Sequence, residues 1–387
     1  MNATLNPEVL QWARKKAGLS EETLAKRIGV HLGLVKEWES TGSIPISIVE
    51  KLAEKTRIAF GFLFLKELPT QKLPIADFRR IDDTLPPVPS DDLLDIIYDA
   101  QRKQNWYREY LISNGYKPLP FVGKFSIKTP VNETANDIVK TLNIGCALVG
   151  KTTKWEETIR YTIEAAEEHG ILVLRAGFAG GSTSRKLDVE EFRGFAMSDK
   201  HAPLIFINGA DAPAAQIFTV AHEIAHIWIG ETGVSNLART YATDGDVEKY
   251  CNSVAAEVLL PMQELKSAWR GKKNDITEIE RLAYKYKISR IVVARRARDA
   301  WLLDQETFNN CYKLFSTKPV KAKSGWSDYF QNEKYRNSRM FSITVLQEAL
   351  AGRVMQRDAM QFLGIKKEST LRKYANSLQG GVEWPIF

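Results

Sequence analysis

Prolines crowd one short part of the chain and divide the sequence. Five of the fifteen prolines fall within residues 69–89: Pro69, Pro74, Pro86, Pro87 and Pro89. Because proline fixes φ and has no backbone N–H, neither a helix nor a central strand is expected there. We therefore predict a linker over residues 68–90, which follows a helical domain at 1–67.

The composition is that of a globular protein with more than one domain. The 387 residues are 44% hydrophobic and 26% charged, which predicts two or three folded domains. No run of about 18 apolar residues occurs and the N-terminus lacks a secretory core segment, so no membrane contact is expected. Three widely spaced cysteines argue against a disulfide framework and favour a cytoplasmic location. The net charge of +7 permits a nucleic-acid partner without requiring one.

The part of the chain after the linker mixes helices with a few short strands. We predict a helical connector, a mixed domain and a basic helical region, at 91–134, 135–303 and 304–387. Aromatic and β-branched residues indicate three strands in the mixed domain, at 171–177, 192–198 and 202–209. The expected fold class is α+β: an all-α N-terminal bundle of five helices, a domain with a small sheet, and a last helical stretch from about 339 to 378.

Residues 19–40 have the pattern of a helix-turn-helix. Leu24 lies on the inner face of a first helix, Gly29 allows a tight turn, and Val35 and Trp38 give a second helix a buried face. With the GSIP and LAEKT segments that follow, this stretch resembles the Cro/repressor-type (XRE) helix-turn-helix family.

The resemblance implies binding of double-stranded DNA through residues 19–40. The positions that would face the bases are His31, Leu32, Gly33 and Lys36. None of them is an Arg, Asn or Gln, the side chains that read bases through paired hydrogen bonds. This module is therefore expected either to bind DNA or to recognise a partner protein.

The segment HEIAH at 222–226 is the strongest indication of chemistry. On a helix, His222 and His226 project from one face about one turn apart, so both imidazoles can bind one metal ion. Glu223 beside them can accept a proton from a water that the metal activates. The chain has only five histidines, so composition alone does not explain this pair.

A catalytic zinc site needs a third protein ligand and an open coordination position. The predicted helix at 246–261 offers two glutamates, Glu248 near its start and Glu257 between apolar residues. Either carboxylate could reach the histidines, and the residues by themselves do not decide between them.

Three separated blocks resemble the ImmA/IrrE family of zinc metallopeptidases. They are EEFRGFAMSD at 190–199, APLIFINGADAPAAQIFTVAHEIAHIWIG at 202–230 and VEKYCNSVAAEVLLP at 247–261. The resemblance implies a small-sheet, zincin-like metallopeptidase domain that binds Zn²⁺ through His222, His226 and Glu248. It also implies that Glu223 is the catalytic base.

The same resemblance implies a function. Similar proteins are site-specific endopeptidases whose substrate is a regulatory protein, often a helix-turn-helix repressor, and whose cutting switches on genes in a stress response or a mobile element. We expect a cytoplasmic zinc endopeptidase of this kind, for which a homodimer is an open option. Two alternatives also stay open: a DNA-binding regulator or antitoxin-like protein whose peptidase domain only binds metal, and a sensor in which metal occupancy changes DNA binding.

Several weaker features complete the expectations. Tyr241 or Arg239 could donate a hydrogen bond to the oxyanion, and an exposed strand edge at 203–208 could pair with an extended substrate. The segment GCALVGKT at 145–152 has phosphate-loop spacing, but a helix rather than a strand is predicted before it, so nucleotide binding is not expected. The apolar end GGVEWPIF is expected to pack on its own domain.

Overall fold

The structure is a computed structural model of the chain. It describes residues 2–17, 19–56, 58, 60–67, 75–77, 89–145, 150–181, 185–235, 246–316 and 335–378. The chain divides into two compact units: residues 1–72 with 88–90, and residues 73–87 with 91–387. Most of the expected linker lies outside the described residues.

The N-terminal unit is built from helices around one small core. Its helices are α1 (Pro7–Lys16), α2 (Glu21–Ile28), α3 (Leu32–Thr41), α4 (Ile46–Thr56) and the 3-10 helix η1 (Phe60–Phe64). A two-stranded antiparallel sheet pairs β1 (Asn2–Thr4) with β2 (Ser43–Pro45). This sheet was not predicted, because strands of three residues are too short to show an alternating pattern.

The helix-turn-helix forms from α2 and α3. Ser20 caps α2 by accepting a hydrogen bond from the backbone N–H of Thr23 (3.1 Å), and Gly29 ends the helix in the left-handed conformation with φ 81°. A buried ion pair ties α1 to α3, because Arg14 Nε and Nη2 donate to the two carboxylate oxygens of Glu39 at 2.6 and 2.7 Å. This ion pair fixes the orientation of α3 relative to α1.

A five-stranded mixed sheet lies at the centre of the larger unit. Its strands have the order β3 (Ala76–Asp77), β7 (Gly233–Ser235), β5 (Gly194–Met197), β6 (Leu204–Asn208) and β4 (Leu172–Ala176). Strand β5 is antiparallel to both neighbours, whereas β4 pairs with β6 and β3 with β7 in parallel. The three predicted strands are β4, β5 and β6. Strand β3 comes from the proline-rich segment and lies at an edge, where such sequence is tolerated.

Side chains alternate between the two faces of the sheet, and each face contributes to a separate core. On β6, Leu204 and Phe206 belong to one core, while Ile205 and Ile207 belong to the other. A strand that is covered on both faces has a continuous apolar sequence, which explains why β6 shows no alternation of polar residues.

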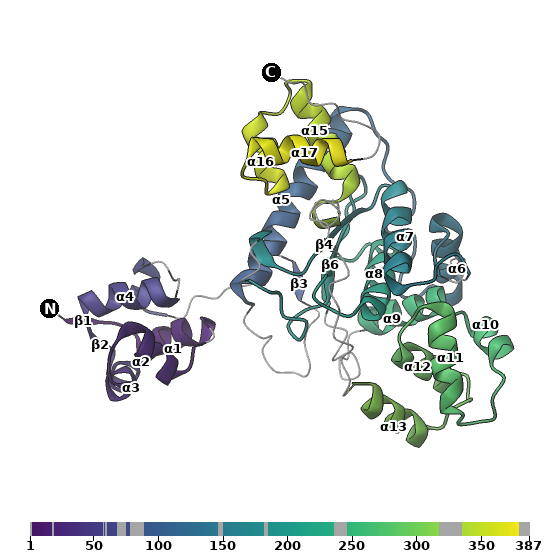
Figure 1. The fold of residues 1–387 in the computed structure, drawn as a ribbon, viewed down its shortest axis with the longest axis horizontal. Helices are drawn as coiled ribbons and strands as arrows, with labels where there is room; N and C mark the ends of the chain where they lie inside the picture. Colours follow the sequence, from purple (N-terminus) through teal and green to yellow (C-terminus); the bar gives the residue numbers. More distant parts are fainter. Residues whose placement is uncertain are drawn as a thin grey trace. The chain divides into compact units, whose positions relative to one another are not determined.

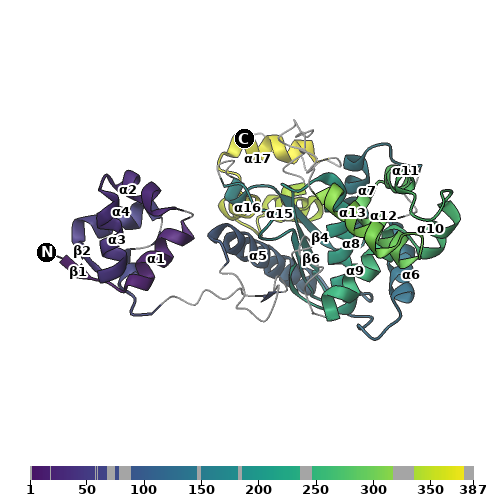
Figure 2. The same cartoon turned by 90° about the horizontal axis from the view of Figure 1, so that it is seen from below.

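Helices cover both faces of this sheet (Figure 1, Figure 2). One face carries α5 (Asp91–Ser113), α15 (Arg339–Leu350), α16 (Gln356–Leu363) and α17 (Glu368–Ser377). The other carries α6 (Val131–Leu142), α7 (Trp155–Glu168), α8 (Pro213–Ile229) and α9 (Asp246–Leu259), extended by α10 (Met262–Ala268), α11 (Ile276–Tyr286), α12 (Arg290–Asp299) and α13 (Gln305–Ser316). A short 3-10 helix, η3 (Ala179–Gly181), follows β4. This arrangement confirms the α+β class.

The last helical stretch expected over 339–378 consists of three helices, with breaks at 351–355 and 364–367. Buried polar contacts hold it to the rest of the unit. Lys103 of α5 donates to Asn337 (2.8 Å), and the backbone N–H of Arg339 donates to Glu167 of α7 (3.1 Å). Burial raises the pKa of Glu167 to about 8.

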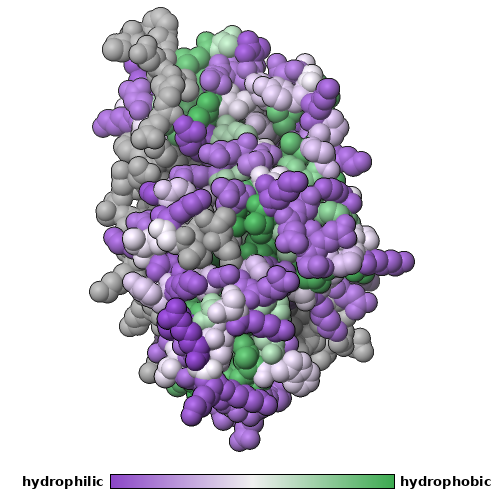
Figure 3. All heavy atoms as spheres, turned by 90° about the vertical axis from the view of Figure 1, so that its right-hand side faces the viewer, coloured by the Kyte–Doolittle hydropathy of each residue, from purple (hydrophilic) through white to green (hydrophobic). Residues whose placement is uncertain are grey.

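The surface over α10–α13 is mostly hydrophilic, with hydrophobic side chains in small separate areas (Figure 3). Among the described helices, none has both the length and the apolar content needed to cross a bilayer. Two of the cysteines, Cys251 and Cys311, are buried free thiols, and Cys146 lies outside the described residues.

Candidate metal centre

Helix α8 carries the HEIAH segment through the interior of the domain. Polar contacts fix both of its ends: Gln216 donates to the backbone carbonyl of Asp211 (2.6 Å), and Trp228 Nε1 donates to Asp137 (2.9 Å). Gly230 then ends the helix in the left-handed conformation. Because other elements surround α8, the two histidines and the glutamate of HEIAH are fully buried.

Two helices bring together three side chains that could hold a metal ion. His222 and His226 come from α8, and Glu248 comes from the first turn of the neighbouring α9. The Nε2 atoms of the two histidines are 3.1 Å apart. Glu248 Oε2 lies 3.3 Å from His222 Nε2, and Glu248 Oε1 lies 3.0 Å from His226 Nε2.

These distances fit a tetrahedral metal site. Nitrogen and oxygen ligands bind zinc at about 2.0–2.2 Å, so two of them in a tetrahedral arrangement stand about 3.4 Å apart. The two imidazole nitrogens are 3.1 Å apart and each lies within 3.3 Å of one of the two carboxylate oxygens, so one ion can contact all three side chains. Two imidazoles and one carboxylate form a donor set that catalytic zinc uses, with a fourth position left for water or substrate.

The electrostatics of the cluster favour the protonation states that metal ligands require. Burial raises the pKa of Glu248, but the charges and hydrogen bonds of the two histidines outweigh this effect and hold that pKa well below its usual range. Burial lowers the pKa of His226, with the hydrogen bond to Glu248 opposing it. Both directions favour the forms that bind a cation, a charged carboxylate and a neutral imidazole.

Glu223 lies against β5 at a point where only a glycine fits. A Cβ atom added to Gly194 would lie 2.9 Å from Glu223 Oε1, 2.6 Å from Thr219 Cγ2 and 2.9 Å from the carbonyl oxygen of Phe206. Such distances are well below normal carbon contacts. Gly194 therefore allows α8 to approach the sheet and sets the place of the Glu223 carboxylate. Gly194 was not predicted from the sequence, although a glycine within an apolar strand often marks the close approach of another element.

The structure separates the two candidate third ligands. Glu257 follows Glu248 by nine residues on α9, which places it on the opposite face of the helix. It forms an ion pair with Arg296 and accepts a hydrogen bond from the backbone N–H of Met262. Asn252, which was not singled out from the sequence, has a buried Oδ1 without a hydrogen bond in the described part of the chain. Its signal is the spacing of four residues from Glu248, which puts both side chains on one face.

Other expectations around the site have mixed outcomes. The prediction of an exposed strand edge at 203–208 was wrong, because β6 is paired with β4 on one side and β5 on the other. The segment at 145–152 follows helix α6 rather than a strand, as predicted, and 146–149 lie outside the described residues. Tyr241, Arg239 and the end of the chain after residue 378 also lie outside them.

The four residues expected to face DNA lie at the start of α3. His31 caps this helix, since its Nδ1 accepts a hydrogen bond from the backbone N–H of Gly33 (3.1 Å). Gly33 and Lys36 are exposed, while Leu32 is half-buried. Lys36 Nζ lies 3.8 Å from Glu21 Oε2. The only cation of α3 is thus already close to a carboxylate.

Comparison with protein families assigns three parts of the chain. Residues 10–63 match the helix-turn-helix family, and residues 166–298 match the peptidase M78 family, described as the IrrE N-terminal-like domain. The second match contains the whole cluster together with Glu223. Residues 337–377, which cover α15–α17, match a domain of unknown function, and no curated protein matches the chain. The chain therefore combines a helix-turn-helix domain with an IrrE-like metallopeptidase domain, the XRE and ImmA/IrrE architecture that its sequence resembles.

Proposed function

We propose that this protein is a zinc-dependent endopeptidase of the cytoplasm that cleaves a regulatory protein at a specific site and so controls gene expression. The observation that carries the proposal is the convergence of His222, His226 and Glu248 next to Glu223 in an IrrE-like domain. In this proposal the first three residues hold the metal and Glu223 is the catalytic base.

The chemistry follows from the residues. A zinc ion held by the two imidazoles and the carboxylate would supply Lewis acidity to the attacking water and to the scissile carbonyl. Glu223 accepts a proton from the water as the water adds to the carbonyl carbon. It then transfers this proton to the amine as the C–N bond breaks. The buried, apolar surroundings of α8 strengthen these interactions by excluding bulk water.

The N-terminal unit is proposed to select the substrate. The outer surface of α3 carries exposed Leu34, exposed Glu37 and Lys36, which lies close to Glu21. An apolar residue with charges of both signs suits a protein partner better than a row of phosphates. The expected partner is a helix-turn-helix repressor, and binding of duplex DNA by residues 19–40 is the alternative.

Zinc affinity is expected to depend on Glu248 and not on Glu257. Replacing Glu248 with Gln removes the charged ligand, so the affinity should fall by more than about 100-fold, the upper loss seen for outer-shell partners. Glu257→Gln is the matched control, because it makes the same change on the opposite face of α9 and should leave the affinity unchanged. Competition with a chromophoric chelator measures both values. A larger loss for Glu257→Gln would contradict the assignment of the third ligand.

Cleavage itself can be tested in a lysate of cells that naturally contain the target. The purified full chain is added with zinc, with a chelator, or with a chelator followed by excess zinc, and new protein N-termini are identified by labelling and mass spectrometry. We expect new termini in one or very few proteins, lost with the chelator and restored by zinc. Termini that do not respond to the chelator, or no new termini under any condition, would favour a DNA-binding regulator or antitoxin-like protein whose peptidase domain is a metal-binding or sensing module.

A further inference from the structure

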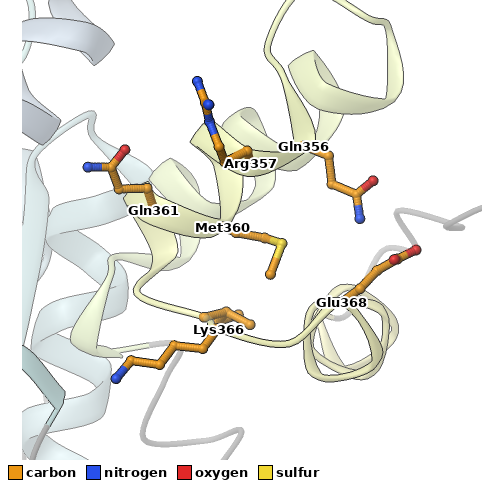
Figure 4. A pocket seen from close by; sticks show the side chains of 7 residues that line it. Gln356, Arg357, Met360, Gln361, Lys366 and Glu368 are labelled. Carbon is orange, nitrogen blue, oxygen red and sulfur yellow. The ribbon is translucent and has the colours of Figure 1, made fainter.

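The C-terminal helices α16 and α17 repeat the geometry of α2 and α3. Helices α2 and α16 each have eight residues, and each ends at a left-handed glycine, Gly29 with φ 81° and Gly364 with φ 65°. Helices α3 and α17 each have ten residues. The connections differ by one residue, with three residues in the first pair and four in the second. Figure 4 shows α17 almost end-on below α16, so the two axes cross steeply, as in a helix-turn-helix.

The buried positions of the two pairs also correspond. In α2, Leu24 and Ile28 lie five and one residues before the glycine and are buried, and Ala359 and Leu363 have the same places in α16. The second helices share a buried pattern of positions i, i+3 and i+4, formed by Val35, Trp38 and Glu39 in α3 and by Leu371, Tyr374 and Ala375 in α17. Residues 356–377 therefore have the core of a second helix-turn-helix.

The exposed sides of α3 and α17 differ strongly in charge. Helix α3 has one exposed basic residue, Lys36, and one exposed acidic residue, Glu37, whereas Glu39 is buried against Arg14. By contrast, residues 364–377 carry four Lys or Arg and one acidic residue, Glu368, whose carboxylate is paired with Arg372 at 2.6 Å. The whole described C-terminal segment, 335–378, has eight basic and three acidic residues. The pair α16–α17, called the second module below, therefore carries a positive charge that the pair α2–α3 lacks.

Three lysines of this module are available to an anion. Lys366 and Lys367 in the connection and Lys373 on α17 are exposed, and none forms an ion pair within the described part of the chain. Ser369, Lys373 and Asn376 follow one another at spacings of four and three residues, so they form one exposed stripe along α17. Lysine contacts phosphates or guanine, and asparagine reads adenine through two hydrogen bonds.

The connection between the helices remains open to solvent. A hollow between α16 and the beginning of α17 is lined by residues that include Gln356, Arg357, Lys366 and Glu368, with Met360 directed into it (Figure 4). Most of the side chains that line this hollow are long and polar, and Lys366 is one of them.

We propose that α16 and α17 form a second helix-turn-helix that binds double-stranded DNA, with α17 as the helix that enters the major groove. Steep packing of two helices around a left-handed glycine supplies the shape, and the exposed Lys366, Lys367 and Lys373 supply the charge that phosphates attract. Such binding would give a role to the domain of unknown function at residues 337–377. It also goes beyond the proposed protease function, since the same chain would then hold its enzyme domain on DNA. The proposal of DNA binding rests on α16, α17 and their connection, and it does not depend on peptide cleavage.

The test uses the zinc-loaded full chain and a fluorescent duplex of mixed sequence of about 30 base pairs, or about three turns. Anisotropy gives the affinity between about 50 and 200 mM salt. The variant Lys366→Gln/Lys367→Gln/Lys373→Gln should weaken binding by about tenfold or more and reduce the salt slope by about two to three, because each phosphate contact contributes about 0.9. The matched control, Lys266→Gln/Lys272→Gln/Lys273→Gln, removes the same charge from exposed lysines near α10 and should keep the wild-type slope.

A second variant separates DNA binding from folding. Ser369→Asp places a carboxylate in the first turn of α17, where it stabilises the helix but repels phosphates. We expect the thermal midpoint to stay the same or rise while duplex affinity falls by about tenfold or more. The proposal is overturned if both module variants bind the duplex like the control, or if the wild type does not bind it at about 50 mM salt. It is also overturned if polyglutamate displaces the protein as well as unlabelled duplex does, because the surface is then a general polyanion site.

Discussion

Glu223→Gln is expected to slow peptide cleavage strongly while leaving zinc binding unchanged. Glutamine has the shape of glutamate and fits the same buried place beside Gly194, but its amide does not accept a proton at neutral pH. A general base contributes about 10²–10⁴-fold to a rate, so cleavage of the substrate found in the lysate should slow by that factor. Initial cleavage rates and zinc content, measured on the same preparations, check both parts of the prediction.

The matched control for this variant is Glu168→Gln. Glu168 is exposed at the end of α7, and the substitution makes the same chemical change away from His222, His226 and Glu248. Its rate should stay within about twofold of the wild type, as for most surface changes. A Glu223→Gln enzyme that keeps more than about a tenth of the wild-type rate would remove Glu223 from the role of base.

Gly194→Ala is expected to damage both stability and catalysis. The added methyl group would lie 2.6 Å from Thr219 Cγ2 and 2.9 Å from Glu223 Oε1, so α8 or the glutamate must move. Overfilling a packed site costs about 1–3 kcal/mol in the free energy of unfolding. A displacement of about 1 Å at a catalytic group can cost about 100-fold in rate, so kcat/KM should fall by a similar factor. Denaturant unfolding and cleavage rates measure the two effects.

A second substitution tests whether the clash is the cause. Thr219→Ser removes the methyl group nearest to the new Cβ but keeps the hydroxyl that donates to the carbonyl of Ala215, so it should restore part of the stability to Gly194→Ala. Gly61→Ala is the control, because its Cβ would meet no atom within 4 Å. If Gly194→Ala were as stable and as active as Gly61→Ala, the close approach of α8 to β5 would not position Glu223.

The pairing of the two histidines was predictable because their arrangement is local. A helix places residues at i and i+4 on one face, so His222 and His226 are neighbours in any fold that contains this helix. The third residue of the cluster was harder to predict, because the choice between Glu248 and Glu257 depends on which face of α9 meets α8. From the residues alone both glutamates were suitable, and Glu248 was favoured only through the family resemblance.

Gly194 was missed for a related reason. Its role comes from the distance between β5 and α8, and such distances between elements are set by packing that a linear sequence does not contain. The predicted strand position was right, yet a glycine in an apolar strand has several possible explanations. The wrong expectation for 203–208 has the same origin, because the segment shows that β6 is a strand but not which strands lie beside it.

The C-terminal module shows how a local signal can be read too coarsely. Helical periodicity over 339–378 was correct, but Gly352 and Gly364 divide the stretch into three helices with left-handed glycines at the breaks. Glycine is tolerated within a predicted helix and also ends helices, so its position alone does not distinguish the two cases. The resemblance to α2 and α3 became visible only when the buried residues were known.

Experiments inside cells test whether this protein is a selective protease that depends on Glu223. New protein N-termini are compared between cells that produce the wild type and cells that produce Glu223→Gln at equal levels, with zinc present and a stress applied. We expect new termini in one or two regulatory proteins of the wild-type cells and none of these termini with Glu223→Gln. Identical sets of termini in both cultures would contradict it and would leave the metal centre with a binding role only.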